Sequence, residues 1–521
     1  MNIYSSTFAQ SLVATPDAPS LCVQGNTYTY RELEPWVNGC RQALLECGLQ
    51  TGQPVALLAS RSLLAYVTIL ACAAEGFTWV PLNPAFPDAR NQRMLALSGA
   101  QVLVVGEEAA DTGQRLAEQN PVPWMLAMGN ISGARAIVPS VTPLPLPAVD
   151  AQSPAYLLFT SGTTGVPKGI PVSAGNLHAY LENFHALYPL PSGLRYSQMF
   201  DLTFDLSVHD LFVCWHHGGC LVIPAAQDLL LPIQFVRRQQ IQVWFSVPSM
   251  ASIAKQSGLL RPAVLPSLQY AFFCGEALPV SSADAWFAAA PNARVANLYG
   301  PTEATIAITA FELQRDATKS PSDDWRQLSV VPIGWPYLTQ QVRVVRDDGT
   351  EAAQGESGEL WLAGSQLTAG YLSDTEKTAA VFVTQDFPES TEKRWYRTGD
   401  CASLHPVFGL LYAGRLDRQV KINGFRVELQ DIEHSLRQVA RTELVAVLPW
   451  PQGADGLYTG VAGFVVQPGS SPEIILRELR ELLPAYMQPG QILELERMPV
   501  NANGKVDYGA LKQWLANGSA N

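Results

Sequence analysis

The sequence has 521 residues, of which 47% are hydrophobic and 15% are charged, and its 34 basic and 46 acidic residues give a net charge of −12. This length exceeds one compact core, so two or more globular domains are expected. The acidic balance and the lack of a Lys/Arg cluster argue against nucleic acid or an anionic membrane as a partner. Without an apolar run of membrane-spanning length or a leader-like start, the expected location is the cytoplasm.

Cysteines and histidines show neither a disulfide framework nor metal-ligand spacing. The eight cysteines are scattered without a C-x-x-C pair, so reduced thiols are expected. Among the seven histidines, His216 and His217 are adjacent, which would point their side chains to different sides of a helix or a strand. A surface or core role is therefore favoured over a ligand role.

Strand and helix patterns alternate through the first part of the chain. The periodicity predicts a strand running into a helix over 27–48, a strand at 55–58, a helix at 62–75, and strands at 78–81 and 101–105. This alternation predicts an α/β fold with a mostly parallel sheet. Residues 139–154 are rich in proline and lack periodicity, which predicts a surface linker.

A loop rich in glycine and hydroxyl groups follows the apolar strand predicted at 155–159. It reads Thr160, Ser161, Gly162, Thr163, Thr164, Gly165, Val166, Pro167, Lys168, Gly169. Its glycines let backbone amides approach an anion, its hydroxyls add donors, and Lys168 adds a positive charge. The spacing does not match a Walker-type nucleotide loop. The alternative interpretation is a surface turn.

The remaining chain continues the α/β pattern and then changes. A helix is predicted at 174–187 and strands near 220–223, 243–247 and 270–273, while short alternating strands within 341–372 predict a small β subdomain. A boundary near Asp417 would separate residues 1–416 from 417–521. The second part, with helices at 429–441 and 474–483, predicts a small α+β domain.

Three later segments carry groups suited to a nucleotide. The first is Asn297, Leu298, Tyr299, Gly300, Pro301, Thr302 and Glu303, with an aromatic face, a hydroxyl and a carboxylate such as Mg²⁺ requires. In the second, Asp400 suits two ribose hydroxyls and Arg415 suits ribose or phosphate. In the third, Lys505 follows an Asn-Gly turn. Taken alone, each segment could be an ordinary turn with solvated side chains.

Asp205 lies in an otherwise apolar run, Phe204 to Ser207. An unpaired carboxylate in such a position is costly, and a cationic partner would relieve the cost. A helix N-cap is the alternative, and it suits Asp201 better.

Together these motifs resemble the adenylate-forming superfamily of acyl-CoA synthetases, firefly luciferase and amino-acid adenylation domains. Nearly the whole chain is similar to stand-alone amino-acid adenylation enzymes, among them the D-alanine:carrier-protein ligases, notably at 273–276, 299–307 and 483–487. The resemblance implies a large N-terminal domain of two α/β subdomains and a small β-barrel-like subdomain. It also implies a mobile α+β C-terminal domain that rotates about a hinge at Asp417.

The resemblance also assigns roles, with ATP and Mg²⁺ as cofactors. Tyr299 would stack on adenine, Thr302 would touch the α-phosphate, Glu303 would hold Mg²⁺, Lys505 would bridge the substrate carboxylate and the α-phosphate, and Asp205 would bind the substrate ammonium. The implied ATP site comprises Thr160, Ser161, Gly162, Thr163, Thr164, Gly165, Lys168, Gly275, Glu276, Ala277, Asn297, Leu298, Tyr299, Gly300, Pro301, Thr302, Asp400, Tyr412, Arg415 and Lys505. The implied substrate pocket comprises Asp205, Leu206, His209, Ser246, Phe272, Cys274, Leu298, Ile306 and Ala307.

The implied reaction joins an amino acid to AMP and then to the phosphopantetheine thiol of a carrier protein. The chain ends fourteen residues after Asp507, so the carrier is expected to be a separate protein. His209, Phe272 and Leu298 depart from a D-alanine enzyme, and the pocket predicts a small or compact, possibly non-proteinogenic amino acid. The rivals are an acyl-CoA or aryl-CoA synthetase, disfavoured by Asp205, and a non-catalytic adenylate-binding regulator, disfavoured by the intact motifs.

Overall fold

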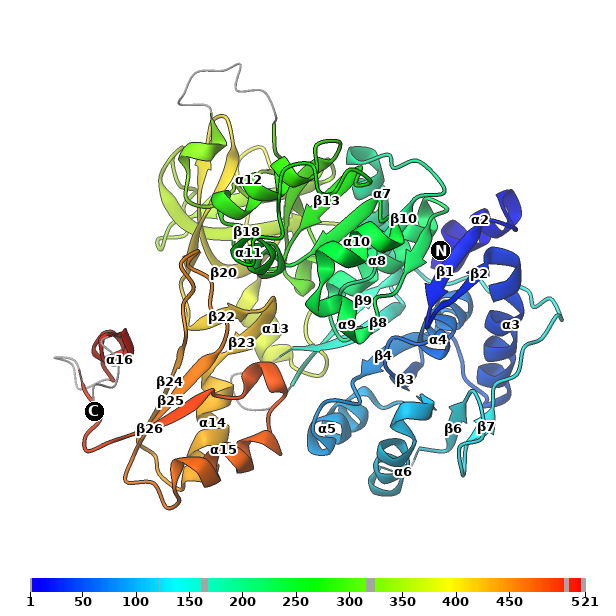
Figure 1. Ribbon diagram of the computed structural model, residues 1–521, viewed down its shortest axis with the longest axis horizontal. Coiled ribbons are helices and arrows are strands. Elements are labelled where there is room, and N and C mark those ends of the chain that lie inside the picture. Colours follow the sequence, from blue (N-terminus) through cyan, green and yellow to red (C-terminus); the bar gives the residue numbers. More distant parts are fainter. Residues whose placement is uncertain (1, 121, 161–166, 315–323, 501–505, 517–521) are drawn as a thin grey trace. The chain divides into compact units, whose positions relative to one another are not determined.

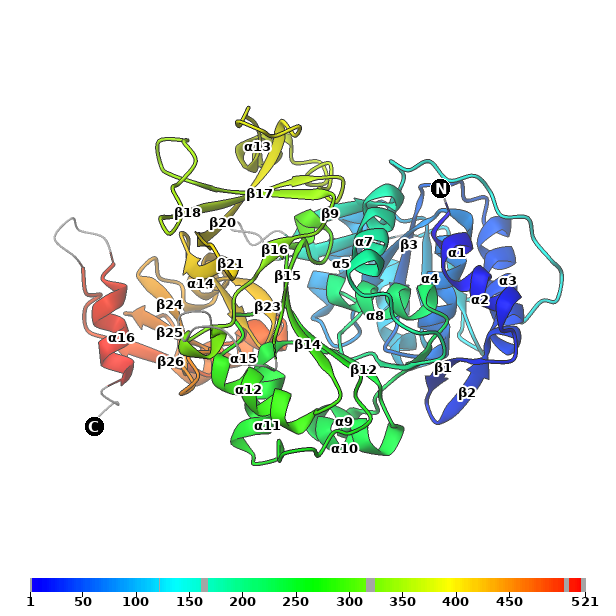
Figure 2. The same ribbon diagram turned by 90° about the horizontal axis from the view of Figure 1, so that it is seen from above.

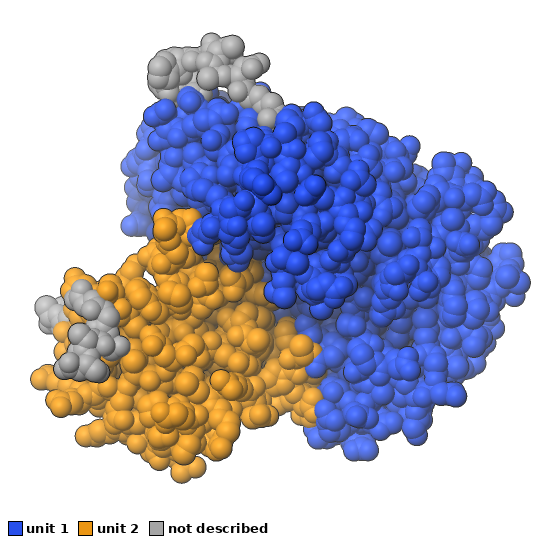
Figure 3. All heavy atoms as spheres, in the orientation of Figure 1, with its two compact units in different colours: residues 1–84, 94–159, 169–417 blue, residues 85–93, 160–168, 418–521 orange. Residues whose placement is uncertain are grey.

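The computed structural model describes residues 2–120, 122–160, 167–314, 324–500 and 506–516. Its contacts divide the chain into two compact units, coloured separately in Figure 3. The first unit holds residues 1–84, 94–159 and 169–417, and the second holds 85–93, 160–168 and 418–521. The second unit therefore includes two short segments from early in the chain, which no sequence pattern indicated.

A seven-stranded sheet in the first part of the chain has the order β7-β6-β5-β3-β4-β8-β9. The pairs whose register is defined are parallel, as the α/β alternation predicts. The central strands are buried on both faces, which explains their continuous apolar sequences. The strands are β3 (Pro54–Leu58), β4 (Thr78–Leu82), β5 (Val102–Val105), β6 (Trp124–Ala127), β7 (Arg135–Ala136), β8 (Pro154–Thr160) and β9 (Lys168–Ser173).

Helices α3 (Tyr30–Glu46), α4 (Leu63–Glu75), α5 (Asp88–Ser98) and α6 (Ala110–Gln119) accompany these strands (Figure 1). A capping box between Thr29 and Glu32 starts α3, and Gly76 ends α4 in the left-handed region, where glycine is favoured. The buried Arg41 of α3 pairs with Glu75 and donates hydrogen bonds to the carbonyls of Leu144 and Pro145. The predicted linker is thus a non-regular segment fixed to the core through its main chain.

A nine-stranded sheet has the order β16-β15-β14-β13-β12-β10-β11-β1-β2. Its centre is parallel and both edges are antiparallel, so five of its eight strand pairs are parallel, in agreement with the expected mostly parallel sheet. The strands are β1 (Pro19–Val23), β2 (Asn26–Thr29), β10 (Arg195–Ser197), β11 (Cys220–Val222), β12 (Val243–Ser246), β13 (Tyr270–Phe273), β14 (Arg294–Tyr299), β15 (Thr309–Glu312) and β16 (Trp335–Pro336).

Two helices belonging to this sheet matter most for function, α7 (Ala174–Leu187) and α8 (Asp205–His216). Both are visible side by side in Figure 2, and contacts join them. α7 starts at a capping box formed by Ser173 and Asn176 and matches the predicted helix at both ends. The other helices are α1 (Ile3–Ser6), α2 (Phe8–Ala14), α9 (Ala226–Leu230), α10 (Pro232–Gln239), α11 (Pro248–Gln256) and α12 (Val280–Ala289).

The predicted β subdomain is a five-stranded antiparallel sheet that completes the first unit. Its strands β17 (Gln340–Val345), β18 (Ser357–Gly364), β19 (Phe382–Thr384), β20 (Arg394–His405) and β21 (Gly409–Arg415) accompany α13 (Thr375–Val381). Alternate buried side chains along β20 explain the period-two pattern of its sequence.

The C-terminal part of the second unit is α+β. A hairpin of β22 (Gln419–Ile422) and β23 (Phe425–Glu428) precedes a sheet of β24 (Val445–Pro449), β25 (Val461–Val466) and β26 (Gln491–Leu495), with α14 (Leu429–Ala440), α15 (Pro472–Arg480) and α16 (Tyr508–Ala516). The rings of Phe425 and Tyr486 stack at 3.9 Å. Among the described residues, no helix combines the length and apolarity that crossing a membrane requires.

Candidate active site

The carboxyl ends of three parallel neighbours, β12, β13 and β14, gather many of the predicted site residues. In register, Ser246 faces Phe273, and Phe272 faces Ala296. Parallel strands end at the same edge of a sheet, which is where α/β proteins bind ligands. Ser246, Cys274 and Tyr299 therefore lie at one edge although they are far apart in the sequence.

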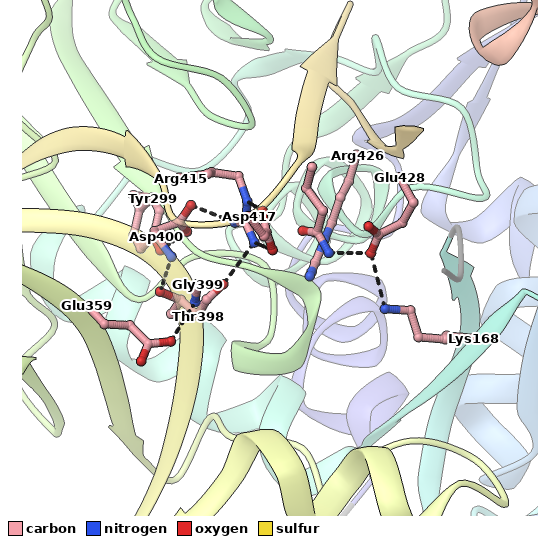
Figure 4. Close-up of polar contacts among 11 residues, drawn as sticks. Lys168, Tyr299, Glu359, Thr398, Gly399, Asp400, Arg415, Asp417, Arg426 and Glu428 are labelled. Atoms are coloured by element: carbon pink, nitrogen blue, oxygen red, sulfur yellow. Dashed lines mark hydrogen bonds and ion pairs between the residues drawn. The ribbon is translucent and has the colours of Figure 1, made fainter. Parts of the chain in front are cut away.

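Tyr299 at the end of β14 joins two residues of the β subdomain, as Figure 4 shows. Its hydroxyl donates to Oδ2 of Asp400 over 2.5 Å, and the guanidinium of Arg415 contacts Oδ1 of Asp400 at 2.6 Å. Arg415 also binds the carboxylate of Asp417 and the carbonyl of Thr398. Asp400 is 6% exposed, so these bonds hold a nearly buried carboxylate in place.

Burial is the largest cause that raises the pKa of Tyr299 well above its usual value, and the charge of Asp400 adds to it. Tyr299 is therefore a neutral phenol that donates a hydrogen bond to Asp400. Burial likewise raises the pKa of Tyr412, on the same strand as Arg415. The cluster offers two neutral aromatic groups, one carboxylate and one guanidinium, a set suited to a nucleoside.

Asn297 contributes an acceptor without a partner. Its Nδ2 donates to the carbonyls of Val331 and Pro332, at 3.3 and 3.0 Å. Its Oδ1 is buried and has no hydrogen-bond partner among the described residues. Leaving a buried acceptor unsatisfied is unfavourable, so this oxygen is suited to a ligand N–H such as an exocyclic amine.

Gly300 follows Tyr299 at a point where no side chain fits. A Cβ there would lie 2.6 Å from Cα of Ala307, so the close approach of the two backbones requires glycine. After Pro301, the short 3₁₀ helix Thr302–Ala304 carries Glu303, which is fully buried. Tyr371 donates to Oε1 of Glu303 at 2.8 Å. A fully buried carboxylate is costly, and a bound cation is one way to offset that cost.

The segment Gly275–Ala277 follows β13. Gly275 has a φ of 95°, a value that favours glycine. Oε2 of Glu276 accepts a hydrogen bond from the backbone N–H of Ser249 in the first turn of α11, at 2.8 Å. The predicted nucleotide residue Glu276 therefore has a structural contact in the described chain, satisfying a backbone donor at a helix start.

Asp205 is the first residue of α8, and the N-cap is Phe204. The N-cap alternative for Asp205 is therefore wrong, while Asp201 accepts hydrogen bonds from the backbone and hydroxyl of Thr203 just before the helix. Asp205 is 8% exposed, and its charge is among the influences that raise the pKa of the buried Tyr156 and Tyr180 after burial itself. The carboxylate of Asp205 thus lies near two buried tyrosines, Tyr156 and Tyr180.

One helical turn after Asp205, His209 occupies the centre of an aromatic group. Its ring lies 4.2 Å from that of Phe245, 4.8 Å from Phe184 and 6.0 Å from Phe272, and its Nδ1 is 2.5 Å from the hydroxyl of Tyr180. Burial lowers the pKa of His209 to about 3, with a smaller contribution from His217, so the imidazole is neutral.

The other predicted pocket residues are buried but differ in what they can offer. The hydroxyl of Ser246 accepts from Trp244 and donates to the carbonyl of Val247, so its one proton is already used. Apolar residues of the predicted set belong to one core cluster: Leu206, Phe272, Cys274, Leu298, Ile306 and Ala307. The sequence reasoning missed Tyr180 and Phe184 on α7, because a helix in a different stretch of sequence gives no local signal of approach to α8.

Several predicted residues lie outside the described residues: Ser161, Gly162, Thr163, Thr164, Gly165 and Lys505. Thr160 ends β8 and Lys168 begins β9. Within the second unit, Nζ of Lys168 lies 3.4 Å from Oε1 of Glu428, which also accepts from Gln419 (Figure 4). Lys168, predicted from its loop as a phosphate ligand, has here a carboxylate partner from β23.

Comparison with known proteins decides what this arrangement belongs to. The model of the family described as AMP-binding enzyme matches residues 8–372, more than half of the chain. The chain belongs to this family. A D-alanine–D-alanyl carrier protein ligase of Bacillus mycoides is 30% identical over 513 residues, with 95% of this chain and 96% of the relative covered.

Solved structures agree with this family membership. The Vibrio cholerae adenylation domain AlmE, in complex with glycyl-adenosine-5′-phosphate, has a TM-score of 0.89 and 32% identity, with 99% of this chain and 98% of that chain covered. The structure of IdnL7 has a TM-score of 0.72 at 32% identity, with 100% and 99% covered. The predicted fold class, with a large N-terminal part and a small C-terminal part, is thereby confirmed.

Proposed function

We propose that this enzyme activates a small amino acid with ATP and transfers it to the phosphopantetheine thiol of a separate carrier protein. The observation that carries the proposal is the buried Asp205, close enough to the buried Tyr156 and Tyr180 to raise their pKa, in the unit that also holds the Tyr299–Asp400–Arg415 cluster. A buried carboxylate suits the ammonium group of an amino acid, whereas a fatty or aryl acid offers no cation.

The nucleoside half of the site follows from the described contacts. Asp400, fixed by Tyr299 and Arg415, would accept hydrogen bonds from the ribose hydroxyls. Oδ1 of Asn297 would accept from the adenine amino group, and the ring of Tyr299 would stack on the base. Thr302 and the loop that includes Thr160 would contact the phosphates.

Magnesium accompanies ATP in this proposal. Glu303 fits as its ligand, because a fully buried carboxylate is a hard oxygen donor of the kind Mg²⁺ prefers. When bound, the ion would neutralise phosphate charge and orient the leaving group. Tyr371 holds the carboxylate of Glu303 through its 2.8 Å hydrogen bond.

The chemistry proceeds in two displacements. A carboxylate oxygen of the amino acid attacks the α-phosphorus, the bond to the bridging oxygen breaks, and pyrophosphate leaves with its electron pair. The pantetheine thiolate then attacks the carbonyl carbon, and AMP leaves. The protein mainly positions these groups and offsets their charge, and Lys505 would supply the cation for the first displacement.

A small side chain is proposed because three large residues of the predicted substrate pocket, His209, Phe272 and Leu298, are buried, and the rings of His209 and Phe272 are in contact. AlmE is described with glycyl-adenosine-5′-phosphate, and the curated relatives are D-alanine enzymes, so both point to small amino acids. The three bulky positions depart from what we expect of a D-alanine enzyme. Glycine is therefore included beside alanine, serine and small β-amino acids as a candidate substrate.

Two units divide the work in this proposal. The first unit ends at Asp417, and Lys505 belongs to the residue range of the second unit. We propose Asp417 as the hinge about which the second unit alternates between adenylation and thiol transfer. Because ATP and reduced thiols are available in the cytoplasm, the enzyme is proposed to work there.

The direct test is the loading of carrier proteins. Purified enzyme, ATP, Mg²⁺ and single amino acids are incubated with holo carrier proteins, and the carriers are analysed by intact mass spectrometry. The proposal expects a mass increase equal to one small aminoacyl group, reversed by hydroxylamine. Loading of coenzyme A with a fatty or aryl acid, without any aminoacyl transfer, would instead identify an acyl-CoA synthetase.

A further inference from the structure

Three histidines of the first unit come together where α7 and α8 end. His185 lies in the last turn of α7, His216 is the last residue of α8, and His217 is its C-cap. Their ring centroids are 5.1 Å apart for His185 and His217, 5.3 Å for His185 and His216, and 5.0 Å for His216 and His217. One ring nitrogen from each residue lies within 4.8 Å of the other two.

The adjacency of His216 and His217 suggested side chains on different sides of a helix. That expectation is wrong for this pair, because α8 ends at His216 and both rings contact His185. The sequence gives no sign that the three histidines cluster, because His185 belongs to another helix. Only the packing of α7 against α8 gives three ligand-bearing side chains a common point.

His217 has the orientation of a metal-ligating histidine. Its Nδ1 lies 2.8 Å from the carbonyl oxygen of Val213, which can only accept a hydrogen bond. Nδ1 therefore carries the proton, and Nε2 carries the lone pair. That lone pair accepts a hydrogen bond from Nδ1 of His185 at 3.0 Å, in the place where a metal ion would lie. A backbone carbonyl that fixes the tautomer in this way is the usual outer contact of a histidine ligand.

His216 supplies a nitrogen that has no hydrogen-bond partner among the described residues. This nitrogen is Nδ1, and it is buried. An imidazole with an unused nitrogen is a ligand for a transition-metal ion.

We propose that His185, His216 and His217 form a binding site for a transition-metal ion, with Zn²⁺ as the reference ion. Zinc–nitrogen bonds of about 2.0–2.1 Å at tetrahedral angles place two ligand nitrogens about 3.3 Å apart. The 3.0 Å between His185 and His217 is close to this value. His185 is exposed, so it can rotate to complete the site and gives the ion a path from solvent.

Binding at this point would link the two helices that build the substrate pocket. α7 carries Tyr180 and α8 carries His209, which hydrogen-bond to each other. A metal ion at the helix ends would therefore hold these two residues in register. The three histidines lie outside the residues assigned to ATP and amino acid, so the proposal of a metal site does not rest on the proposed reaction.

The test uses untagged, full-length enzyme stripped of metal by a chelator, and Zn²⁺ as the titrant in calorimetry. One site per chain and an increase in Tm with Zn²⁺ are expected. His185→Gln, which changes an exposed side chain, should weaken the site at least about tenfold, and His217→Ala should do the same. His434→Ala, which removes an exposed histidine of α14, should leave the affinity unchanged.

Co²⁺ provides a second measurement that reports geometry. Wild-type enzyme should give the intense visible absorption of a tetrahedral nitrogen site, and His185→Gln should lose it while keeping its circular dichroism spectrum. The proposal is overturned if wild type binds no Zn²⁺, or if His185→Gln and His217→Ala bind Zn²⁺ as tightly as His434→Ala does. Pyrophosphate exchange by the zinc-free enzyme, measured with Mg-ATP, reports separately on the proposed function.

Discussion

The hydroxyl of Tyr180 and Nδ1 of His209 lie 2.5 Å apart, joining α7 to α8 beside the buried ring of Phe272. His209 is neutral, because burial lowers its pKa to about 3. The pair therefore acts as a fixed, uncharged wall of the proposed pocket. Its volume, more than any charge, would limit how large a substrate side chain can be.

Removing this wall should widen substrate choice. His209→Ala deletes the ring that contacts Phe245 and Phe184, and the resulting space should raise kcat/KM for valine or leucine relative to alanine by about tenfold or more. Tyr180→Phe is the matched control, because it keeps the volume and removes one hydrogen bond worth about 1 kcal/mol. Its side-chain preference should stay as in wild type, measured by pyrophosphate exchange. If both variants and the wild type show the same preference among amino acids, the substrate side chain does not lie against His209.

Asp205→Asn should damage amino-acid binding while leaving ATP binding intact. Losing the charge partner of a buried ammonium typically costs about 3–5 kcal/mol, so KM for the amino acid should rise by two or more orders of magnitude. Asp201→Asn serves as the control, since Asp201 bonds Thr203 and Asn83 before α8. Near-normal amino-acid-dependent exchange by Asp205→Asn would show that Asp205 does not bind the substrate ammonium, and would remove the main argument against the acyl-CoA synthetase alternative.

Asp400 should bind the ribose hydroxyls and so distinguish ATP from 2′-deoxy-ATP. Wild-type enzyme is expected to use ATP better than 2′-deoxy-ATP, and Asp400→Asn should lose most of that preference and raise KM for ATP. A hydrogen bond to a charged group contributes about 1.5–3 kcal/mol, or roughly 10- to 100-fold. Arg415 would still have Asp417 as a partner, which limits structural damage. An unchanged ratio between the two nucleotides in Asp400→Asn would contradict this assignment.

Lys505 and Asp417 should separate the half-reactions. Lys505→Ala should slow aminoacyl-AMP formation by on the order of 10²- to 10³-fold, yet load a carrier from synthetic aminoacyl-AMP at nearly the wild-type rate. Asp417→Pro should still form aminoacyl-AMP but should load the carrier slowly, because the fixed φ of proline resists rotation of the second unit. If both variants lose both half-reactions equally while remaining folded, domain alternation does not describe this enzyme.

Local stability around α14 should depend on pH, because the carboxyl group of Asp431 in its first turn is buried. Burial raises its pKa from 3.8 to about 6, Glu428 adds to this, and Arg90, His434 and Arg93 oppose it. Because the folded state holds the proton more tightly than the unfolded state, stability falls as pH rises from about 4 to 6, by on the order of 3 kcal/mol.

Asp431→Asn should remove this loss. The free energy of opening α14, measured by hydrogen exchange, should increase in the variant relative to wild type as the pH rises through this window and stay constant above it. The exposed Asp386 offers a control, and Asp386→Asn should show no such trend. A constant difference between Asp431→Asn and wild type from pH 4 to 7 would contradict the buried-carboxyl interpretation.

Elements with strong local periodicity could be predicted from the sequence. The helix 174–187 and the strand 270–273 match the structure at both ends, because capping residues and apolar runs mark them locally. In the large sheet, the antiparallel edge pairs β1–β2 and β14–β15 join strands that are neighbours in the sequence. The parallel pairing of β1 with β11 could not be predicted, because these two strands lie far apart in the chain.

The candidate site divides in the same way. Asn297, Tyr299 and Glu303 share one short motif, so the sequence indicated them together. The contacts of Tyr180 with His209 and of Lys168 with Glu428 could not be predicted, because each joins segments that are distant in the sequence. The histidines at the ends of α7 and α8 are a third case, because their proximity depends on where a helix ends.

Amino-acid-dependent ATP–pyrophosphate exchange measures directly whether the enzyme activates amino acids. Each proteinogenic amino acid, D-alanine, β-alanine and a set of fatty and aryl acids is offered singly to the enzyme with Mg-ATP and labelled pyrophosphate. We expect strong exchange with one or a few of glycine, alanine, serine and small β-amino acids, and background exchange with tryptophan, arginine and every acid that lacks an amino group. Strong exchange with a fatty or aryl acid and none with any amino acid would contradict it.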